Sequence, residues 1–160
     1  MNMSSPSQPI ILLVEDDSCD IEQIQGMVRK LDLPVTLVVA QTGEEALIWL
    51  AGAPGAGPLP SLVLLDLGLP VISGLEVLDW IRGPAGLASL PVVVFSSSTN
   101  RQDIQDASDA GANGYFLKTA SQATLEQLVS FWWEHWLLRT GTIGMENLNL
   151  LRCRESMAPV

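Results

Sequence analysis

Five short apolar runs alternate along the chain with longer segments whose apolar residues recur at helical spacing. The runs span residues 10–14, 35–39, 62–65, 92–95 and 114–118. Continuous apolar or β-branched runs of this length, bounded by Gly, Pro and acidic residues, are typical of strands in a mostly buried parallel sheet. The pattern therefore predicts five strands.

The segments that follow the runs have apolar residues every three or four positions, which predicts a helix after each strand. Strands that alternate with helices form a parallel sheet with right-handed crossovers and with helices on both faces. We therefore expect an α/β fold: a doubly wound (βα)5, flavodoxin-like three-layer sandwich with strand order 2-1-3-4-5. The predicted helices span about 19–31, 42–50, 74–82, 100–110 and 125–138.

The length of 160 residues fits one domain with a single substantial core. Residues 1–9 are polar and are predicted to form a disordered lead. We assign residues 10–138 to the domain, and residues 139–160 to a C-terminal extension that is irregular or associated with a dimer. Hydrophobic residues make up 48% of the chain, so we expect that much of the surface either carries few charges or is covered by a partner.

The net charge of −10 argues against nucleic acid or an anionic membrane as a direct partner, because both require clustered Lys and Arg. Cys19 and Cys153 are far apart and have neither metal spacing nor a disulfide framework around them. The first residues lack the features of a secretory signal, and no apolar run approaches membrane-spanning length. We expect a cytoplasmic globular protein.

Acidic residues directly follow two strands that are neighbours in the predicted order. Glu15 and Asp16 follow the first strand, and Asp66 follows the third. In open α/β sheets ligands bind at this carboxyl edge, where the three side chains would converge. Close carboxylates repel one another unless a cation neutralises them, and a set of hard oxygens suits Mg²⁺. The alternative is that the first group only caps a helix and Asp66 only forms a turn.

Two further strand ends add a hydroxyl group and a positive charge. Ser96 follows the fourth apolar run, and Lys118 ends the fifth. A phosphoryl group on Asp66 would need a cation on one side and a hydroxyl donor and a positive charge on the others, because catalysis of phosphoryl transfer consists of positioning and charge neutralisation. Taken singly, Ser96 would be a turn residue and Lys118 a surface charge; together they indicate a phosphoryl site.

The motifs that carry these residues are Leu-Val-Glu-Asp-Asp (13–17), Leu-Leu-Asp-Leu-Gly-Leu-Pro (64–70) followed by Gly74, Val-Val-Val-Phe-Ser-Ser (92–97) and Gly-Ala-Asn-Gly-Tyr-Phe-Leu-Lys (111–118). Over about residues 9–138 the chain closely resembles the receiver domain of two-component response regulators. The resemblance implies a signalling protein that accepts a phosphoryl group from a sensor histidine kinase. It would not be an enzyme beyond catalysing its own phosphorylation and dephosphorylation.

The resemblance also implies a role for each residue. Asp66 would be the phosphoacceptor, Ser96 the switch hydroxyl, Lys118 the charge partner of the phosphoryl group and Tyr115 the switch aromatic. Asp17 matches a variable position. The Mg²⁺ ligands would be Asp16 directly, Glu15 mainly through water, Asp66, and the backbone carbonyl of Gly68.

Two positions depart from the family pattern. Thr119 stands where the family usually has Pro, often after a cis bond, so the peptide geometry between Lys118 and Thr119 stays open. Gly68 has no side chain that could tune hydrolysis of the acyl phosphate, so the lifetime of the phosphoryl group is not predicted.

The last predicted helix has more aromatic surface than a three-layer domain can bury. Excess aromatic area at a helix end marks an association surface, and we expect a homodimer through this helix and the C-terminal extension. The residues after it are too few for a DNA-binding module, so we expect an output through protein contacts. The predicted interface residues are Phe131, Trp132, Trp133, Trp136 and Leu137.

The Gly- and Pro-rich loop at 51–60, the Lys-Thr-Ala run at 118–120 and the aromatic ending resemble single-domain regulators paired with phytochrome-type histidine kinases. Two alternatives stay open. One is a dimeric binding module of the same fold that phosphorylation does not switch. The other is a flavin-binding doubly wound domain, which the acids after the first strand oppose because they would repel the flavin phosphate.

Overall fold

The computed structural model describes residues 8–53, 55–118, 123, 126–127 and 130. The chain divides into two compact units, residues 1–120 and 121–160. The four described residues of the second unit are helical. The elements of the first unit are β1 (Ile10–Val14), α1 (Ser18–Lys30), β2 (Thr36–Ala40), α2 (Gly43–Leu50), β3 (Leu62–Leu65), α3 (Gly74–Arg82), β4 (Val92–Ser96), α4 (Arg101–Asp109) and β5 (Gly114–Leu117).

The five strands form one parallel sheet in the order β2-β1-β3-β4-β5, which confirms the predicted fold and strand order. Val14 is paired with Leu65 of β3 at the carboxyl ends of the two strands. The backbone N–H of Asp66 then donates to the carbonyl of Val14 at 3.0 Å. Because Val14 and Leu65 are paired, the residues that follow them, Glu15 and Asp66, lie next to each other at the carboxyl edge of the sheet.

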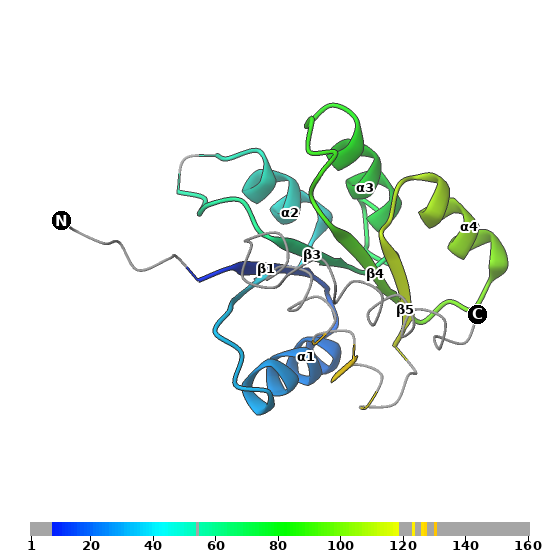
Figure 1. Ribbon diagram of the computed structural model, residues 1–160. Coiled ribbons are helices and arrows are strands. Elements are labelled where there is room, and N and C mark those ends of the chain that lie inside the picture. Colours follow the sequence, from blue (N-terminus) through cyan, green and yellow to red (C-terminus); the bar gives the residue numbers. More distant parts are fainter. Residues whose placement is uncertain (1–7, 54, 119–122, 124–125, 128–129, 131–160) are drawn as a thin grey trace, which may run out of the picture. The chain divides into compact units, whose positions relative to one another are not determined.

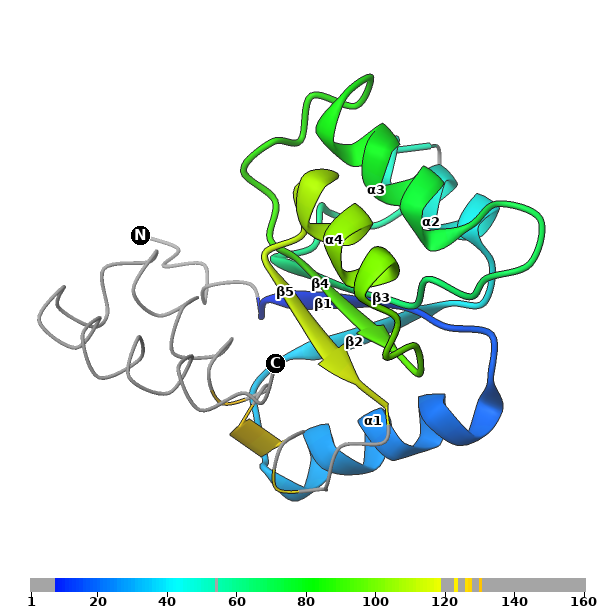
Figure 2. The ribbon, with the colours of Figure 1, turned by 90° about the vertical axis from the view of Figure 1, so that its right-hand side faces the viewer.

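Helices cover both faces of the sheet, with α1 on one face and α2, α3 and α4 on the other (Figures 1 and 2). Side chains along a strand point to alternate faces, so β1 contributes Leu12 and Val14 to the core beneath α2 and α3. The central strands β1, β3 and β4 are almost wholly buried, whereas the outer strands β2 and β5 are partly exposed. The sheet is therefore a rigid platform whose carboxyl edge carries the polar residues.

The observed boundaries differ from the predicted ones by one or two residues, for local reasons. Asp17 caps α1 by accepting hydrogen bonds from the N–H groups of Cys19 and Asp20, so the helix begins at Ser18. Strand β4 runs one residue further than predicted, to Ser96, and β5 ends at Leu117. Lys118 therefore lies just beyond the end of β5.

Most of the last predicted helix, 125–138, lies outside the described residues, and so do all five predicted interface residues, Phe131, Trp132, Trp133, Trp136 and Leu137. Thr119 also lies outside them. The expected homodimer thus stays a prediction from the sequence, and the peptide geometry after Lys118 stays open.

Candidate functional site

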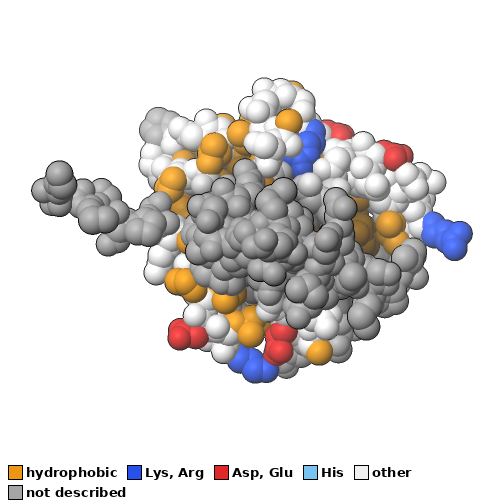
Figure 3. Space-filling view, in the orientation of Figure 1, with side chains coloured by type: hydrophobic (Ala, Val, Ile, Leu, Met, Phe, Trp, Pro, Cys, Tyr) orange, Lys and Arg blue, Asp and Glu red, His pale blue; other side chains and the backbone are white. Residues whose placement is uncertain are grey.

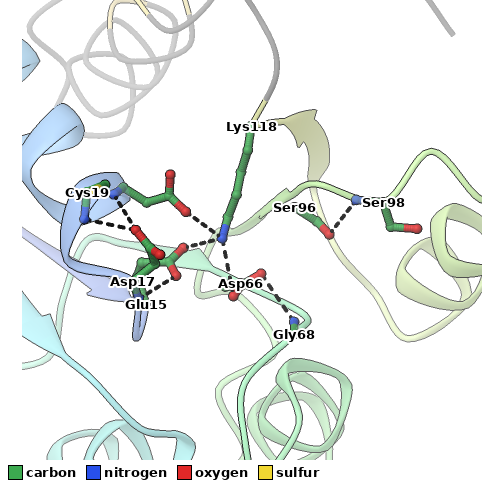
Figure 4. Close-up of polar contacts among 9 residues, drawn as sticks. Glu15, Asp17, Cys19, Asp66, Gly68, Ser96, Ser98 and Lys118 are labelled. Carbon is green, nitrogen blue, oxygen red and sulfur yellow. Dashed lines mark hydrogen bonds and ion pairs between the residues drawn. The ribbon is translucent and has the colours of Figure 1, made fainter.

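The carboxyl end of the sheet carries an acidic groove that is assembled from four strand ends. Glu15 and Asp16 follow β1, Asp66 follows β3, Ser96 ends β4 and Lys118 follows β5. Figure 4 shows the side chain of Lys118 extending toward Glu15 and Asp66. Among the described residues, the charged side chains that line the groove are one lysine and six acids: Glu15, Asp16, Asp17, Asp20, Asp66 and Asp103.

Three of these acids form a tight cluster, as the sequence predicts. One carboxylate oxygen each of Glu15, Asp16 and Asp66 lies within 4.8 Å of the others. Glu15 is 1% exposed and Asp66 is 6% exposed, while Asp16 faces solvent. Burial raises the pKa of Glu15, and the charge of Asp66 raises it further, against hydrogen bonds from Lys118 and from the N–H of Asp17. The donor set is all oxygen, it is partly buried and it is mutually repelling, so it fits a divalent cation such as Mg²⁺.

Lys118 is the cation that faces this cluster. Its Nζ lies 2.7 Å from Glu15 Oε2, 2.9 Å from Asp20 Oδ2 and 3.3 Å from Asp66 Oδ2. Burial by itself lowers the pKa of Lys118, but hydrogen bonds with Glu15 and Asp20 and the charge of Asp66 outweigh burial and raise the pKa. The ammonium group therefore stays charged and offsets part of the repulsion among the acids.

Asp20 is a site residue that the sequence analysis does not predict. An acid in the first turn of a helix is stabilised by the helix dipole, so the position of Asp20 in α1 is explained without any partner outside the helix. Only the rotation of α1 relative to the end of β5 brings its carboxylate to Lys118, and no local pattern reports that rotation.

The backbone around Asp66 is held closely in place. The N–H of Gly68 donates to Asp66 Oδ1 at 3.2 Å, so Gly68 contacts the acid through its N–H. A Cβ at Gly74 would lie 2.1 Å from the carbonyl oxygen of Asp66. Only glycine fits at position 74, and this contact explains why Gly74 accompanies the acidic motif.

Ser96 and Tyr115 are linked through a residue that the sequence analysis missed. The N–H of Ser98 donates to Ser96 Oγ at 3.2 Å, and the hydroxyl of Tyr115 donates to the carbonyl of Ser98 at 2.9 Å. The hydroxyl of Ser98 also donates to the carboxylate of Asp103 in α4. Ser98 thus ties the predicted switch hydroxyl to the predicted switch aromatic. The sequence shows only three consecutive serines, 96–98, which does not distinguish this one.

The model of the response regulator receiver domain family matches residues 11–130. The chain belongs to the response regulator receiver family. Both the strand-end acids and Lys118 lie within the matched residues, so the resemblance inferred from the motifs is confirmed at the level of the family.

Two curated relatives are single chains of similar size. This receiver domain is 36% identical over 129 residues to the probable methanogenesis regulatory protein FilR2 of Methanothrix harundinacea, with 80% of this chain and 83% of FilR2 covered. It is 34% identical over 140 residues to the response regulator Rcp1 of Synechocystis sp., with 82% of this chain and 95% of Rcp1 covered.

Solved structures of Rcp1 and of the phytochrome response regulator RcpA also match this chain. The phosphorylated cyanobacterial phytochrome response regulator RcpA is 37% identical with a TM-score of 0.72, and the match covers 82% of this chain and 95% of RcpA. The Mn²⁺-bound form of Rcp1 is 31% identical with a TM-score of 0.73, and the match covers 78% of this chain and 94% of Rcp1. The receiver domain is therefore related to phytochrome response regulators, and a homologue holds a divalent metal.

Among the described residues, no helix has the length and apolar character needed to cross a membrane. On the face drawn in Figure 3, the described Lys and Arg side chains stand at separate places and form no continuous basic patch.

Proposed function

We propose that this receiver domain accepts a phosphoryl group on Asp66 from a histidine kinase in a Mg²⁺-dependent reaction, and that it signals through protein contacts. The observation that carries the proposal is the environment of Asp66. Its carboxylate is almost buried, it belongs to the cluster of three acids, and it lies 3.3 Å from the ammonium group of Lys118, which also contacts Glu15. A carboxylate that only formed a turn would need neither the acids nor the lysine.

The proposed chemistry is an in-line transfer of the phosphoryl group to Asp66. A carboxylate oxygen of Asp66 forms a bond to phosphorus while the bond from phosphorus to the imidazole nitrogen of a phosphohistidine breaks. The electron pair of the broken bond leaves with the imidazole, which takes up a proton. Lys118 neutralises charge on the phosphoryl oxygens, and such positioned charges supply most of the catalysis in phosphoryl transfer.

The residues that would hold the cation are Glu15, Asp16 and Asp66, together with the backbone of Gly68. A bound divalent cation would supply charge neutralisation at the phosphoryl oxygens and would relieve the repulsion among the carboxylates. Receiver chemistry of this kind has no external turnover, so the protein would act as a phosphoacceptor and catalyse only its own modification.

The switch is proposed to run through Ser98. When Ser96 Oγ turns toward a phosphoryl group on Asp66, it gives up the N–H of Ser98. The carbonyl of Ser98 holds Tyr115, so the loop between β4 and α4 and the tyrosine would shift together. Such a shift changes the population of surface conformations and thereby the affinity for a partner.

The kinase is proposed to be of the phytochrome type, because Rcp1 and RcpA are 34% and 37% identical to this chain and RcpA is a phytochrome response regulator. The alternative, a dimeric binding module that phosphate does not switch, would have no use for the cluster of acids. Copurification with a phytochrome-type kinase would not separate the two, whereas phosphorylation of Asp66 would.

The test is intact-protein mass after incubation with acetyl phosphate and Mg²⁺. We expect one added phosphoryl group in the wild-type protein, and none in Asp66→Asn or in the presence of EDTA. Asp109→Asn, an exposed acid near the end of α4, is the matched control and should be phosphorylated normally. A folded wild-type protein without an adduct would refute the proposal and favour the unswitched binding module.

A further inference from the structure

Asp20 contacts the catalytic lysine from outside the cation cluster. Its Oδ2 lies 2.9 Å from Lys118 Nζ, which is closer than the 3.3 Å between this ammonium group and Asp66 Oδ2. Asp20 is not among the three acids whose oxygens lie within 4.8 Å of one another. It therefore binds the lysine without competing for the cation.

The helix cap fixes the backbone of Asp20. The side chain of Asp17 accepts hydrogen bonds from the N–H groups of Cys19 at 2.8 Å and Asp20 at 3.1 Å. Position 20 is thus held in the first turn of α1, next to the end of β1. Its carboxylate reaches Lys118 across the groove from a rigid element rather than from a loop.

The three carboxylates around Lys118 would behave differently during phosphoryl transfer. An ammonium group has three N–H donors, and here three carboxylates surround it. A cation would draw on Glu15 and Asp66, and the phosphoryl group would form on Asp66 itself. Of these three carboxylates, only that of Asp20 would interact with Lys118 alone throughout the reaction.

We propose that Asp20 is the positioning residue for Lys118, holding its ammonium group beside Glu15 and Asp66 while these two carboxylates engage the cation and the phosphoryl group. The inference rests on the proposed function, since the position of Lys118 matters only if a phosphoryl group forms on Asp66. Lysine is a point charge on a flexible four-carbon chain, and a fixed partner is what keeps such a charge in one place.

A metal-free experiment tests the contact. The chain has two lysines, Lys30 and Lys118, so limiting acetylation followed by peptide mass spectrometry compares the partly buried Lys118 with the exposed Lys30 in one sample. We expect Asp20→Asn to raise the acetylation of Lys118 relative to Lys30 by roughly tenfold, because loss of the carboxylate frees the amine for the reagent. Glu22→Gln, an equal charge change at an exposed position of α1, should leave the ratio unchanged.

The second experiment asks whether Asp20 acts through Lys118. The rate of phosphorylation by acetyl phosphate at saturating Mg²⁺ is measured for Asp20→Asn, Lys118→Met and the double variant. We expect Asp20→Asn to slow the reaction by roughly tenfold, since a misplaced catalytic group costs rate. In the Lys118→Met background the same substitution should have no effect, because interacting residues are not additive. Asp20→Glu, which keeps the charge, should recover part of the rate.

The outcomes separate the two proposals. Absence of phosphorylation in the wild-type protein overturns the proposed function, and the role of Asp20 falls with it. A wild-type rate in Asp20→Asn, or an equal loss of rate in both backgrounds, overturns the role of Asp20 alone. Thermal unfolding checks that each variant is folded. If Asp20→Asn does not fold, the test uses Asp20→Glu, with its acetylation ratio and its rate of phosphorylation. An Asp20→Glu protein that is phosphorylated no faster than Lys118→Met would count against the proposal.

Discussion

In the described part of the chain, each end of the sheet holds a partly buried cation, and the surroundings of the two cations are opposite. At the carboxyl end, the Nζ of Lys118 lies among three carboxylates. At the amino end, Arg82 near the end of α3 has no carboxylate among its described partners. Its guanidinium donates to four neutral oxygens: the carbonyls of Gly111 at 3.0 Å, Leu87 at 3.1 Å and Leu90 at 2.7 Å, and the side-chain oxygen of Asn113 at 2.8 Å.

The two cations differ in what surrounds them: neutral oxygens surround Arg82, and carboxylates surround Lys118. Burial lowers the pKa of Arg82, and its neutral partners are backbone and amide oxygens fixed by the chain. Lys118 has a raised pKa, so its contribution to stability is present below its ordinary pKa and is lost only as the pH rises through the raised value. At the amino end, the charge of Arg82 is balanced by hydrogen bonds to oxygens of the chain itself. At the carboxyl end, the described acids that line the groove outnumber its one described lysine, so an excess of negative charge is left that a bound cation would neutralise.

The largest effect on stability is expected at the amino end. Arg82→Met should lower the free energy of unfolding by roughly 3–4 kcal/mol, because it removes four charge-assisted hydrogen bonds and leaves carbonyl groups without donors. The loops that precede β4 and β5 would lose the side chain that ties them to α3. Urea denaturation measures the change, and Arg101→Met, at an exposed position of α4, is the control. A loss below about 1 kcal/mol would show that water replaces the guanidinium.

A smaller loss of stability, which Mg²⁺ should largely reverse, is expected at the carboxyl end. Lys118→Met should cost about 2 kcal/mol in the absence of divalent cations, because Glu15 and Asp66 then share a buried site without a counter-charge. Added Mg²⁺ should restore much of this loss, since a ligand that binds the folded state stabilises it. The same Mg²⁺ should stabilise Arg82→Met no more than the wild-type protein. Thermal unfolding with and without Mg²⁺ measures both, and equal shifts in the two variants would contradict the division between the ends.

The comparison also shows what the sequence could predict. The buried runs and the acids that directly follow them are local signals, so the strand order and the cluster of Glu15, Asp16 and Asp66 follow from pattern and topology. Arg82 could not be assigned a role, because its partners come from two loop segments, those that precede β4 and β5, which only the fold brings together. Asp20 and Ser98 were missed for the same reason: a helix rotation and a loop path decide their contacts.

The smallest predicted effect concerns strain at the carboxyl end. Val71, in the loop between β3 and α3, has φ of 66° and is 100% exposed. A β-branched residue in the left-handed region is strained and here gains no packing in return. Val71→Asn should therefore stabilise the protein by about 1 kcal/mol, because Asn tolerates this conformation.

Val71→Ala tests the source of this gain, because alanine keeps the Cβ but removes the branch. We expect its stability to lie between that of the wild-type protein and that of the Val71→Asn variant, measured as the denaturant midpoint at an unchanged slope. Stabilisation by Val71→Asn, against destabilisation at Arg82, would mean that the carboxyl end holds backbone strain at Val71 in addition to the repulsion among its acids. If Val71→Asn were neutral or destabilising, the excess negative charge would be the one source of instability left among the described residues at the carboxyl end, and cation binding should relieve it.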